Sequence, residues 1–265
     1  MEAPHRARKR FGQNFLHDPG IIDKIIRAVN ANSNDHLVEI GPGQGAITSE
    51  LLASGALLDA IELDRDLVPA LQNRFADQSN FRIHQADALK FAFATLPLND
   101  EKLRIVGNLP YNISTPLIFH ILEHQALIRD MHFMLQLEVV NRLAAEPGTK
   151  TYGRLSVITQ YYCKVESLFE VPPQAFNPAP KVTSAIVRLT PYSEPPFPAT
   201  NITTLQTLLR TAFNQRRKTL RNSLKTLMPR EQMEALAVDL NARPETLSLE
   251  QFVEISNQID SASLE

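Results

Sequence analysis

Residues 107–111, whose sequence is Gly-Asn-Leu-Pro-Tyr, carry the side chains of this chain that are best suited to chemistry. They follow a run at 103–106 that predicts a buried parallel strand, ending in a Gly-Asn turn. The amide of Asn108 and the ring of Tyr111 are then fixed at the carboxyl end of a strand, where open α/β sheets bind ligands. The backbone carbonyl of Leu109 adds a second acceptor, and two acceptors beside a flat face suit a planar ring with an exocyclic amino group, such as adenine. The alternative is an ordinary strand-to-loop turn with a half-buried tyrosine.

A glycine-rich turn, Gly-Pro-Gly-Gln-Gly at 41–45, comes directly after a predicted strand at 37–40 and before a predicted helix at 46–52. A strand, a glycine-rich turn and a helix form the first unit of a doubly wound nucleotide-binding fold. The glycines let the backbone approach a ligand closely and open the helix N-terminus towards it. Their G-x-G-x-G spacing differs from the G-x-G-x-x-G of dinucleotide enzymes, which argues against a nicotinamide-dependent dehydrogenase.

Two acidic side chains follow the next two predicted strands. Glu62 lies near the end of a strand at 57–63 and 21 residues after Gly41, the spacing at which a carboxylate grips a ribose diol. Asp87 follows the third predicted strand, where a carboxylate suits the amino group of a bound adenine. A solvated strand end for Glu62 and a helix cap for Asp87 are the simpler alternatives.

The composition is that of an ordinary globular protein, with 43% hydrophobic and 21% charged residues in a chain of 265. No run approaches the roughly 18 consecutive apolar residues of a membrane span, and the basic N-terminus lacks the apolar stretch of a signal peptide. The single cysteine, Cys163, cannot form an internal disulfide and fits a reducing cytosol. The sequence has neither a Cys/His cluster of metal-ligand spacing nor a Ser-His-Asp pattern, so we expect no metal centre.

Positive charge is concentrated in two stretches, although the net charge is only −2. Residues 1–10 contain four basic residues and one acidic residue, and residues 195–230 contain seven basic residues and no acidic one, so the remainder is acidic. An acidic body with two basic patches is suited to holding a polyanion at chosen places. Two solvated basic faces are the alternative.

The rest of the pattern predicts the elements that position these groups. Asp18 followed by Pro19 is typical of a helix start, and residues 21–29 have the apolar spacing of a helix. Strands at 165–171 and 184–189 are close enough in sequence to require an antiparallel hairpin. Further predicted elements are a helix at 117–122, a strand at 131–137, helices at 139–145 and 155–162, a linker at 191–198, and helices around 209–227, 230–239 and 248–259.

Phe176 lies on the proline-rich segment between the two hairpin strands. It provides either a second stacking surface or an apolar anchor for the loop. The helix around 209–227 has one apolar face, formed by leucines and Phe213, and one basic face.

Seven motifs occur along the chain in a fixed order, and together they point to a known family. They are 11–16 (Phe-Gly-Gln-Asn-Phe-Leu), the turn at 39–45, Glu62, Asp87, 108–111 (Asn-Leu-Pro-Tyr), 176–178 (Phe-Asn-Pro) and 215–221 (Gln-Arg-Arg-Lys-Thr-Leu-Arg). In this combination the chain closely resembles the ribosomal RNA adenine dimethyltransferases, above all the bacterial enzymes of the small-subunit RNA, over almost its whole length. The resemblance implies an α/β fold with two domains. Residues 1–192 would form an S-adenosylmethionine-dependent methyltransferase domain with a Rossmann-like seven-stranded sheet and a basic N-terminal arm at 1–17. Residues 193–265 would form a small all-helical domain that binds RNA.

The resemblance also implies a cofactor and the residues that hold it. S-adenosylmethionine would lie under Asn14 and Leu16, with Gly41 at its methionine portion, Glu62 at its ribose and Asp87 at its adenine. Gln13, Ala88 and Asn108 are further cofactor candidates.

The implied substrate is a pair of adjacent adenines in a hairpin near the 3′ end of the small-subunit (16S) ribosomal RNA, each methylated twice on N6 during ribosome biogenesis. Asn108, Leu109 and Tyr111 would carry the chemistry, and Tyr111 and Phe176 would stack on the base. The RNA-binding candidates are Arg210, Arg216, Arg217, Lys218, Arg221 and Lys225.

The chemistry of an adenine amino group agrees with these roles. Its nitrogen is a poor nucleophile because the lone pair is delocalised into the ring. Accepting both N–H bonds, at Asn108 and at the Leu109 carbonyl, favours a more tetrahedral nitrogen whose lone pair points at the methyl group. A neutral amide suits the second methylation better than a carboxylate, because a charge left facing a methyl group would be poorly solvated.

Two rival functions remain open at this point. One is methylation of another amino group, on DNA adenine or on a protein glutamine, although the acid-free basic stretch argues against a small protein substrate. The other is a non-enzymatic RNA-binding assembly factor, against which the intact Asn108, Glu62 and Asp87 argue. We expect a cytoplasmic monomer that acts on the immature small ribosomal subunit.

Overall fold

The computed structural model describes residues 13–97, 101–214 and 218–262, which divide into two compact units. The first unit comprises residues up to 140 together with 166–191, and the second comprises 141–165 and 192 onwards. The second unit therefore includes 141–165, which the sequence places in the first domain. No helix among the described residues is both long and apolar enough to cross a lipid bilayer. Those residues also contain no group of three His, Cys, Asp or Glu side chains placed to hold a metal ion.

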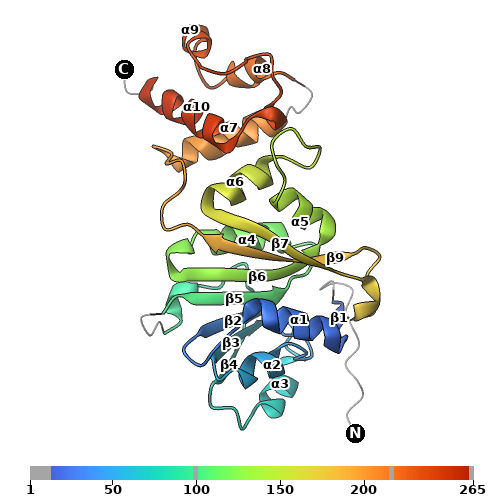
Figure 1. Ribbon diagram of the computed structural model, residues 1–265. Helices are drawn as coiled ribbons and strands as arrows, with labels where there is room; N and C mark the ends of the chain where they lie inside the picture. The colour runs from blue at the N-terminus through green and yellow to red at the C-terminus, as the bar shows by residue number, and fades with distance from the viewer. Residues whose placement is uncertain (1–12, 98–100, 215–217, 263–265) are drawn as a thin grey trace. The chain divides into compact units, whose positions relative to one another are not determined.

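A seven-stranded sheet forms the framework of the first unit, in the order β4-β3-β2-β5-β6-β9-β7 (Figure 1). Strands β4, β3, β2, β5 and β6 are parallel, and β9 pairs antiparallel with β6. The predicted seven-stranded sheet is confirmed. The strands are β2 (His36–Ile40), β3 (Leu57–Glu62), β4 (Phe81–Gln85), β5 (Leu103–Asn108), β6 (Ile128–Gln136), β7 (Cys163–Val171) and β9 (Ser184–Pro191).

The chain order changes direction between β2 and β5, which are hydrogen-bonded neighbours with Ile40 opposite Gly107. The chain goes outward from β2 to β3 and β4, and then returns to build β5 and β6 on the other side. Such a switch point opens a crevice at the carboxyl ends of the two central strands. The glycine-rich turn after β2 and Asn108 at the end of β5 therefore lie side by side.

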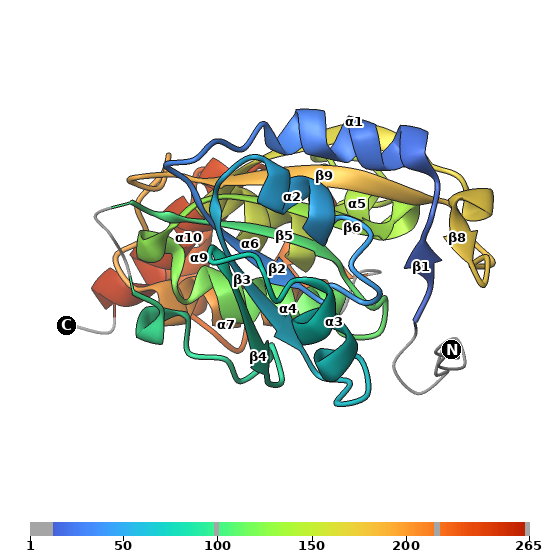
Figure 2. The same ribbon diagram turned by 90° about the horizontal axis from the view of Figure 1, so that it is seen from below.

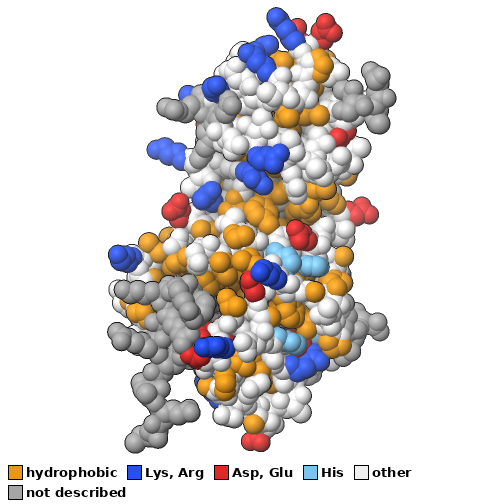
Figure 3. All heavy atoms as spheres, turned by 180° about the vertical axis from the view of Figure 1, so that it is seen from behind, with side chains coloured by type: hydrophobic (Ala, Val, Ile, Leu, Met, Phe, Trp, Pro, Cys, Tyr) orange, Lys and Arg blue, Asp and Glu red, His pale blue; other side chains and the backbone are white. Residues whose placement is uncertain are grey.

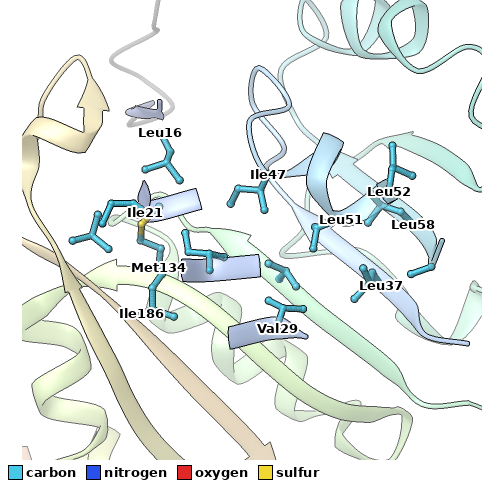
Figure 4. Packing of buried hydrophobic residues seen from close by; sticks show 14 of the residues in the cluster. Leu16, Ile21, Val29, Leu37, Ile47, Leu51, Leu52, Leu58, Met134 and Ile186 are labelled. Carbon is cyan, nitrogen blue, oxygen red and sulfur yellow. The ribbon is translucent and has the colours of Figure 1, made fainter. Parts of the chain in front are cut away.

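Apolar side chains fill the space between one face of this sheet and its helices. Figure 4 shows Ile21 of α1 near Met134 and Ile186, with Leu51 of α2 near Leu37. The helices of the first unit are α1 (Pro19–Val29), α2 (Thr48–Ala53), α3 (Val68–Arg74) and α4 (Ser114–Leu122), followed by α5 (Leu137–Leu143), which extends into the second unit. The buried face of α4 contains the predicted Leu117, Ile118, Ile121 and Leu122.

Helix α1 begins as predicted. The carboxylate of Asp18 accepts a hydrogen bond from the backbone N–H of Ile21 at 3.0 Å, and Pro19 occupies the first turn. This cap satisfies one of the N–H groups that a helix start leaves without a partner. The cap holds the chain where it passes from the cavity region into the helix.

Two short strands lie apart from the main sheet: β1 (Phe15–Leu16) pairs antiparallel with β8 (Phe176–Asn177), as Figure 2 shows. The backbone N–H of His17 adds a bond to the carbonyl of Ala175 at 2.9 Å. Residues 15 and 16 of the N-terminal motif therefore form a short strand. The basic residues 1–10 lie outside the described residues.

Apart from the first residues of β7, the regular elements of the second unit are helices. Its helices are α6 (Arg154–Tyr162), α7 (Ile202–Asn214), α8 (Leu220–Leu224), α9 (Arg230–Glu234) and α10 (Leu249–Ala262), together with the end of α5. The ring of Phe213 lies 6.3 Å from that of Tyr152 and 5.6 Å from that of Phe252, centroid to centroid. These rings and the buried leucines of α7 and α8 form the core of this unit.

The prediction of a single helix with a basic face around 209–227 is wrong. Helix α7 ends at Asn214, Thr219 is extended with φ −72° and ψ 160°, and α8 begins at Leu220. Phe213 and Leu220 are seven residues apart, a spacing that an unbroken helix would also satisfy. No glycine or proline between them signals the break. Elsewhere most helix and strand ends differ from the predicted ones by one to three residues.

Candidate active site

A cavity of about 330 Å³ lies at the carboxyl ends of β2, β3, β4 and β5. Its size is that of a small-molecule site, which is typically about 300–1,000 Å³. Ten predicted residues line it: Gln13, Asn14, Leu16, Gly41, Glu62, Asp87, Ala88, Asn108, Leu109 and Tyr111. Side chains from distant parts of the sequence meet there because parallel strands end at one edge of the sheet.

The glycine-rich turn forms one wall of the cavity. Gly41, Gly43 and Gly45 have φ values of 69°, 58° and 80°, in the left-handed region that side chains disfavour. A Cβ atom on Gly43 would lie 3.1 Å from the ring of Phe15, so this side chain packs directly against the turn. The turn continues to Ile47, and α2 begins later than predicted, at Thr48. The backbone here leaves room for a ligand that a side chain would fill.

Glu62 is almost fully buried and is held by the backbone. Its Oε2 accepts from the N–H of Gly43 at 3.2 Å, and its Oε1 accepts from the N–H of Asp64 at 2.8 Å. A carboxylate has about four lone-pair sites, so acceptor capacity remains for a diol. Burial raises the pKa of Glu62, and the backbone hydrogen bonds partly offset that rise.

Asp87 caps a turn and also lies at the cavity. Its Oδ1 accepts from the backbone N–H of Leu89 at 3.0 Å, which caps the turn after β4. The same residue lines the cavity, so its second oxygen remains as an acceptor for a ligand.

Asn108 is the last residue of β5, not part of a turn as predicted. The strand extends this far because Gly107 and Asn108 pair with Phe133 and Met134 of β6. The side-chain Nδ2 donates to the backbone carbonyl of Asn14 at 3.0 Å. Since the amide nitrogen is committed to a carbonyl, Oδ1 is the part of the side chain left to accept a hydrogen bond.

Gly107 is required by close packing. A Cβ atom at this position would lie 2.8 Å from Cδ2 of Leu109 and 2.9 Å from the backbone oxygen of Ile40. Its absence lets β2 and β5 bring their ends together. This signal was present in the sequence as a glycine inside a strand pattern.

Tyr111 lies half-buried beyond the strand, and its hydroxyl is 2.7 Å from Oγ of Ser184, the first residue of β9. Burial raises the pKa of the phenol, so it stays protonated at neutral pH. The ring therefore has a fixed partner at its far end and lines the cavity.

Phe176 is not brought to the cavity. Its side chain is 3% exposed and packs in the core cluster, and it lies opposite Leu16 in the β1–β8 pair. This is the position of an apolar anchor, the second reading of its sequence. In this arrangement its ring face is not available to a base.

Glu39 was not predicted as a site residue from the sequence. Glu39 lines the cavity and is fully buried, and its Oε2 accepts a hydrogen bond from Oγ1 of Thr48 at 2.7 Å. Burial raises its pKa to about 7, and the nearby Glu62 contributes to the rise. An acid at a strand end directly before the glycine-rich turn was the signal. Phe15 and Leu63, which also line the cavity, gave no such signal because apolar residues occur everywhere in a core.

The predicted RNA-binding residues are only partly described. Arg216 and Arg217 lie outside the described residues. Arg210, Lys218 and Lys225 are exposed, and Arg221 lies 3.8 Å from the carboxylate of Glu234. On the face shown in Figure 3, lysine and arginine side chains are dispersed among other side chains.

The profile of the ribosomal RNA adenine dimethylase family matches residues 4–261. The chain belongs to the ribosomal RNA adenine dimethylase family. It is 63% identical over 255 residues to the ribosomal RNA small subunit methyltransferase A of Pseudomonas putida, covering 96% of both chains. The protein of the same name from Saccharophagus degradans is 62% identical over 255 residues, covering 96% of this chain and 95% of its own.

Two solved structures of related proteins resemble this one over nearly the whole chain. A dimethyladenosine transferase from Plasmodium falciparum has a TM-score of 0.80 and 28% identity, covering 94% of this chain and 98% of its own. The 23S rRNA methyltransferase ErmE has a TM-score of 0.73 and 26% identity, covering 93% and 100%. As a member of this family, the chain is an S-adenosylmethionine-dependent ribosomal RNA adenine dimethyltransferase.

The cavity fits the family's cofactor. Its positive-φ glycines leave room for a ligand against the backbone, and acidic side chains at the ends of β3 and β4 offer hydrogen-bond acceptors in the cavity. Glu39 and Glu62 also suit a ligand that carries positive charge, because a cation offsets the repulsion between two carboxylates buried in one cavity.

Proposed function

We propose that this enzyme methylates N6 of two adjacent adenines, each twice, in a hairpin near the 3′ end of the small-subunit ribosomal RNA. The observation that carries the proposal is the end of β5, where the amide nitrogen of Asn108 is committed to Asn14 and its oxygen is left as an acceptor beside Tyr111. The names of the relatives, ribosomal RNA small subunit methyltransferase A, support the choice of RNA. We further propose that the protein acts as a cytoplasmic monomer on the immature small subunit.

In this proposal Glu62 accepts hydrogen bonds from the ribose hydroxyls of the cofactor and Asp87 accepts from its adenine amino group. Gly41 leaves the backbone free to approach the methionine portion, and Gln13, Asn14, Leu16 and Ala88 close the cavity around it. Gln13 is itself fixed, since its Nε2 donates to Oδ2 of Asp64 at 3.0 Å.

The chain's own residues orient the target nitrogen. S-adenosylmethionine supplies a methyl group that is already activated on a sulfonium. Asn108 Oδ1 and the Leu109 carbonyl accept the two N–H bonds of the adenine amino group, which turns the nitrogen lone pair towards that methyl group. Tyr111 holds the base out of its stack by contact with the ring face. The catalytic contribution of the protein is therefore position and electrostatics.

The same geometry accommodates a second methylation. The first transfer gives the nitrogen a methyl group and releases one of its protons to solvent, so the nitrogen keeps one N–H and one of the two acceptors loses its partner. Both acceptors are neutral carbonyl oxygens, which tolerate a nearby methyl group better than a carboxylate would. Asn108 therefore suits the production of dimethyladenosine.

We assign RNA binding to the helical residues 193–265, with Arg210, Arg216, Arg217, Lys218, Arg221 and Lys225 as contacts, and cofactor binding to residues 1–192. The charge distribution supports this division, because 195–230 contains no acidic residue. Phosphate contacts of this kind position an RNA without reading its sequence.

The test is methyl transfer from labelled S-adenosylmethionine to four acceptors: immature small-subunit particles, bare small-subunit RNA, DNA of the same sequence and a protein mixture. We expect label on the RNA alone, recovered as dimethyladenosine at two adjacent positions. Label on DNA or protein, or on a single isolated adenine, would overturn the proposed substrate. Particles that bind the enzyme without becoming labelled would favour an assembly factor instead.

A further inference from the structure

Ser184 is placed to control the ring of Tyr111. The two side chains come from separate elements, Tyr111 from the segment after β5 and Ser184 from the first position of β9, with β6 between these strands in the sheet. Their hydroxyl oxygens are 2.7 Å apart, and either one can donate. The bond therefore links the loop that holds the tyrosine to a strand two positions away.

The serine end of this bond is rigid. Ser184 is 0% exposed and pairs with Gln136 of β6, and the preceding Thr183 accepts a backbone bond from Leu137 at 3.0 Å. The tyrosine end is less constrained by the backbone, because residues 109 and 110 follow the strand without belonging to a helix or strand. The hydroxyl oxygen lies on the long axis of the ring, so a fixed hydroxyl sets the direction in which the tyrosine side chain points and keeps the ring from swinging away.

A fixed direction of the side chain matters for a base that must be held through two methylations. Stacking depends on the relative position of two flat groups, and a ring that swings away loses contact with the base. Ordering the ring before the substrate arrives also avoids the entropy cost of ordering it on binding. The hydrogen bond between Tyr111 and Ser184 should affect the base and not the cofactor, because in the proposed function Glu62, Asp87 and the glycine-rich turn bind the cofactor.

We infer that Ser184 is a positioning residue: its hydroxyl holds the Tyr111 side chain in the direction that presents the ring to the target adenine, and so controls capture of the base. The inference rests on the proposed function, in which Tyr111 is the stacking surface. It assigns to Ser184 no contact with the reacting atoms.

The experiment is a double-mutant cycle with Ser184→Ala, Tyr111→Phe and the combined variant, together with Ser184→Thr, which keeps a hydroxyl. Each protein is tested for single-turnover methyl transfer over a range of RNA concentrations and for cofactor affinity by calorimetry. A small-subunit RNA with 2-aminopurine at the target position reports stacking through its fluorescence lifetimes.

Ser184→Ala and Tyr111→Phe should each raise the RNA concentration needed for half-saturation about 3- to 10-fold, the effect of losing one ordinary hydrogen bond. The combined variant should be no worse than either single one, because both remove the same bond. In Ser184→Ala the rate at saturating RNA and the affinity for cofactor should each change less than about 2-fold. The 2-aminopurine lifetimes should shift from a mainly quenched population to a mixed one, and Ser184→Thr should restore the parental pattern.

Additive losses in the combined variant would overturn the inference, as would a parental lifetime distribution in Ser184→Ala. If Ser184→Ala weakened cofactor binding by the same factor by which it raised the RNA concentration at half-saturation, Ser184 would only support the fold. Failure of the proposed function is a separate result: the parent protein itself would then place no methyl groups on the ribosomal RNA adenines.

Discussion

At the level of single residues, Asn108 is expected to act in the chemical step. Asn108→Ala deletes an acceptor but keeps β5, because the strand pairs through its backbone. Loss of one preorganised hydrogen-bonding group typically lowers a rate about 100- to 1,000-fold. Single-turnover methyl transfer at saturating RNA and cofactor measures this loss directly.

Tyr111→Ala is the companion variant. It should act on binding of the base, by roughly 1–3 kcal/mol, with a smaller effect on the saturated rate. A parental saturated rate in Asn108→Ala would show that the end of β5 is structural, and the acceptors would have to lie elsewhere at the cavity.

Glu62 is expected to govern cofactor affinity. Glu62→Ala removes the carboxylate held by Gly43 and Asp64 and should weaken cofactor binding by roughly 1.5–3 kcal/mol, the scale of hydrogen bonds to a charged group. Calorimetry with S-adenosylmethionine gives the affinity, and the melting temperature shows whether the variant is folded. A folded variant with unchanged affinity would remove Glu62 from the binding site.

Glu39 makes stability depend on pH in a direction that can be worked out. Burial raises its pKa from 4.5 to about 7, so the folded state binds a proton that the unfolded state has lost between these values. Its stabilising contribution is complete below pH 4.5 and is lost as the pH rises through 7.

Glu39→Gln should remove this dependence without adding a charge. Relative to the parent, the variant should gain on the order of 2 kcal/mol of unfolding free energy between pH 5 and pH 8, since one pKa unit corresponds to about 1.4 kcal/mol. Urea unfolding without cofactor at the two pH values measures the difference. Glu50→Gln, at an exposed position of α2, is the matched control. Parallel pH curves for the parent and Glu39→Gln would exclude Glu39 as the source.

At the level of elements, the contact between β2 and β5 is expected to be intolerant of a side chain. Gly107→Ala would place a Cβ atom 2.9 Å from the backbone oxygen of Ile40, where only a backbone shift relieves the clash. Overpacking of this kind typically costs 1–3 kcal/mol. Methyl transfer should also fall, because Asn108 is the next residue. Chemical denaturation and single-turnover assays measure the two effects.

Gly153→Ala is the control for this substitution. Gly153 has an extended φ of −174° and no atom within 4 Å of a Cβ at this position, so we expect a cost within about 1 kcal/mol. Equal effects of the two substitutions would show that close packing at Gly107 is unimportant.

The elements also show what the sequence can and cannot predict. The sequence placed Glu62, Asp87 and Asn108 close together, and they line one cavity, because each lies at or just after the carboxyl end of a strand and the ends of parallel strands share an edge. Pairing of β1 with β8 was not predicted, because it joins residues more than 150 positions apart and local periodicity carries no information about such contacts. Burial of Phe176 follows from the same pairing. The break between α7 and α8 was missed because the apolar spacing continues across it.

At the level of the whole molecule, we expect charge to separate RNA binding from cofactor binding. The stretch 195–230 contains no acidic residue, which suits a polyanion, while the cavity is lined by acidic side chains. A cation that contacts phosphate contributes to the salt dependence of binding, because the complex releases counterions. Binding of RNA and binding of cofactor should therefore respond to different substitutions.

Arg210→Glu and Lys225→Glu, each at an exposed position, test this separation. Each should weaken binding to small-subunit particles and reduce the slope of log affinity against log salt by about 1. Cofactor affinity should hardly change, because neither residue lines the cavity. Lys102→Glu changes the net charge equally at an exposed residue just before β5, at the amino ends of the strands, and is expected to keep the parental slope. Filter binding at several salt concentrations measures the slopes. If Lys225→Glu and Lys102→Glu lower affinity and slope to the same extent, net charge alone would account for the binding, and the basic stretch would be a solvated face.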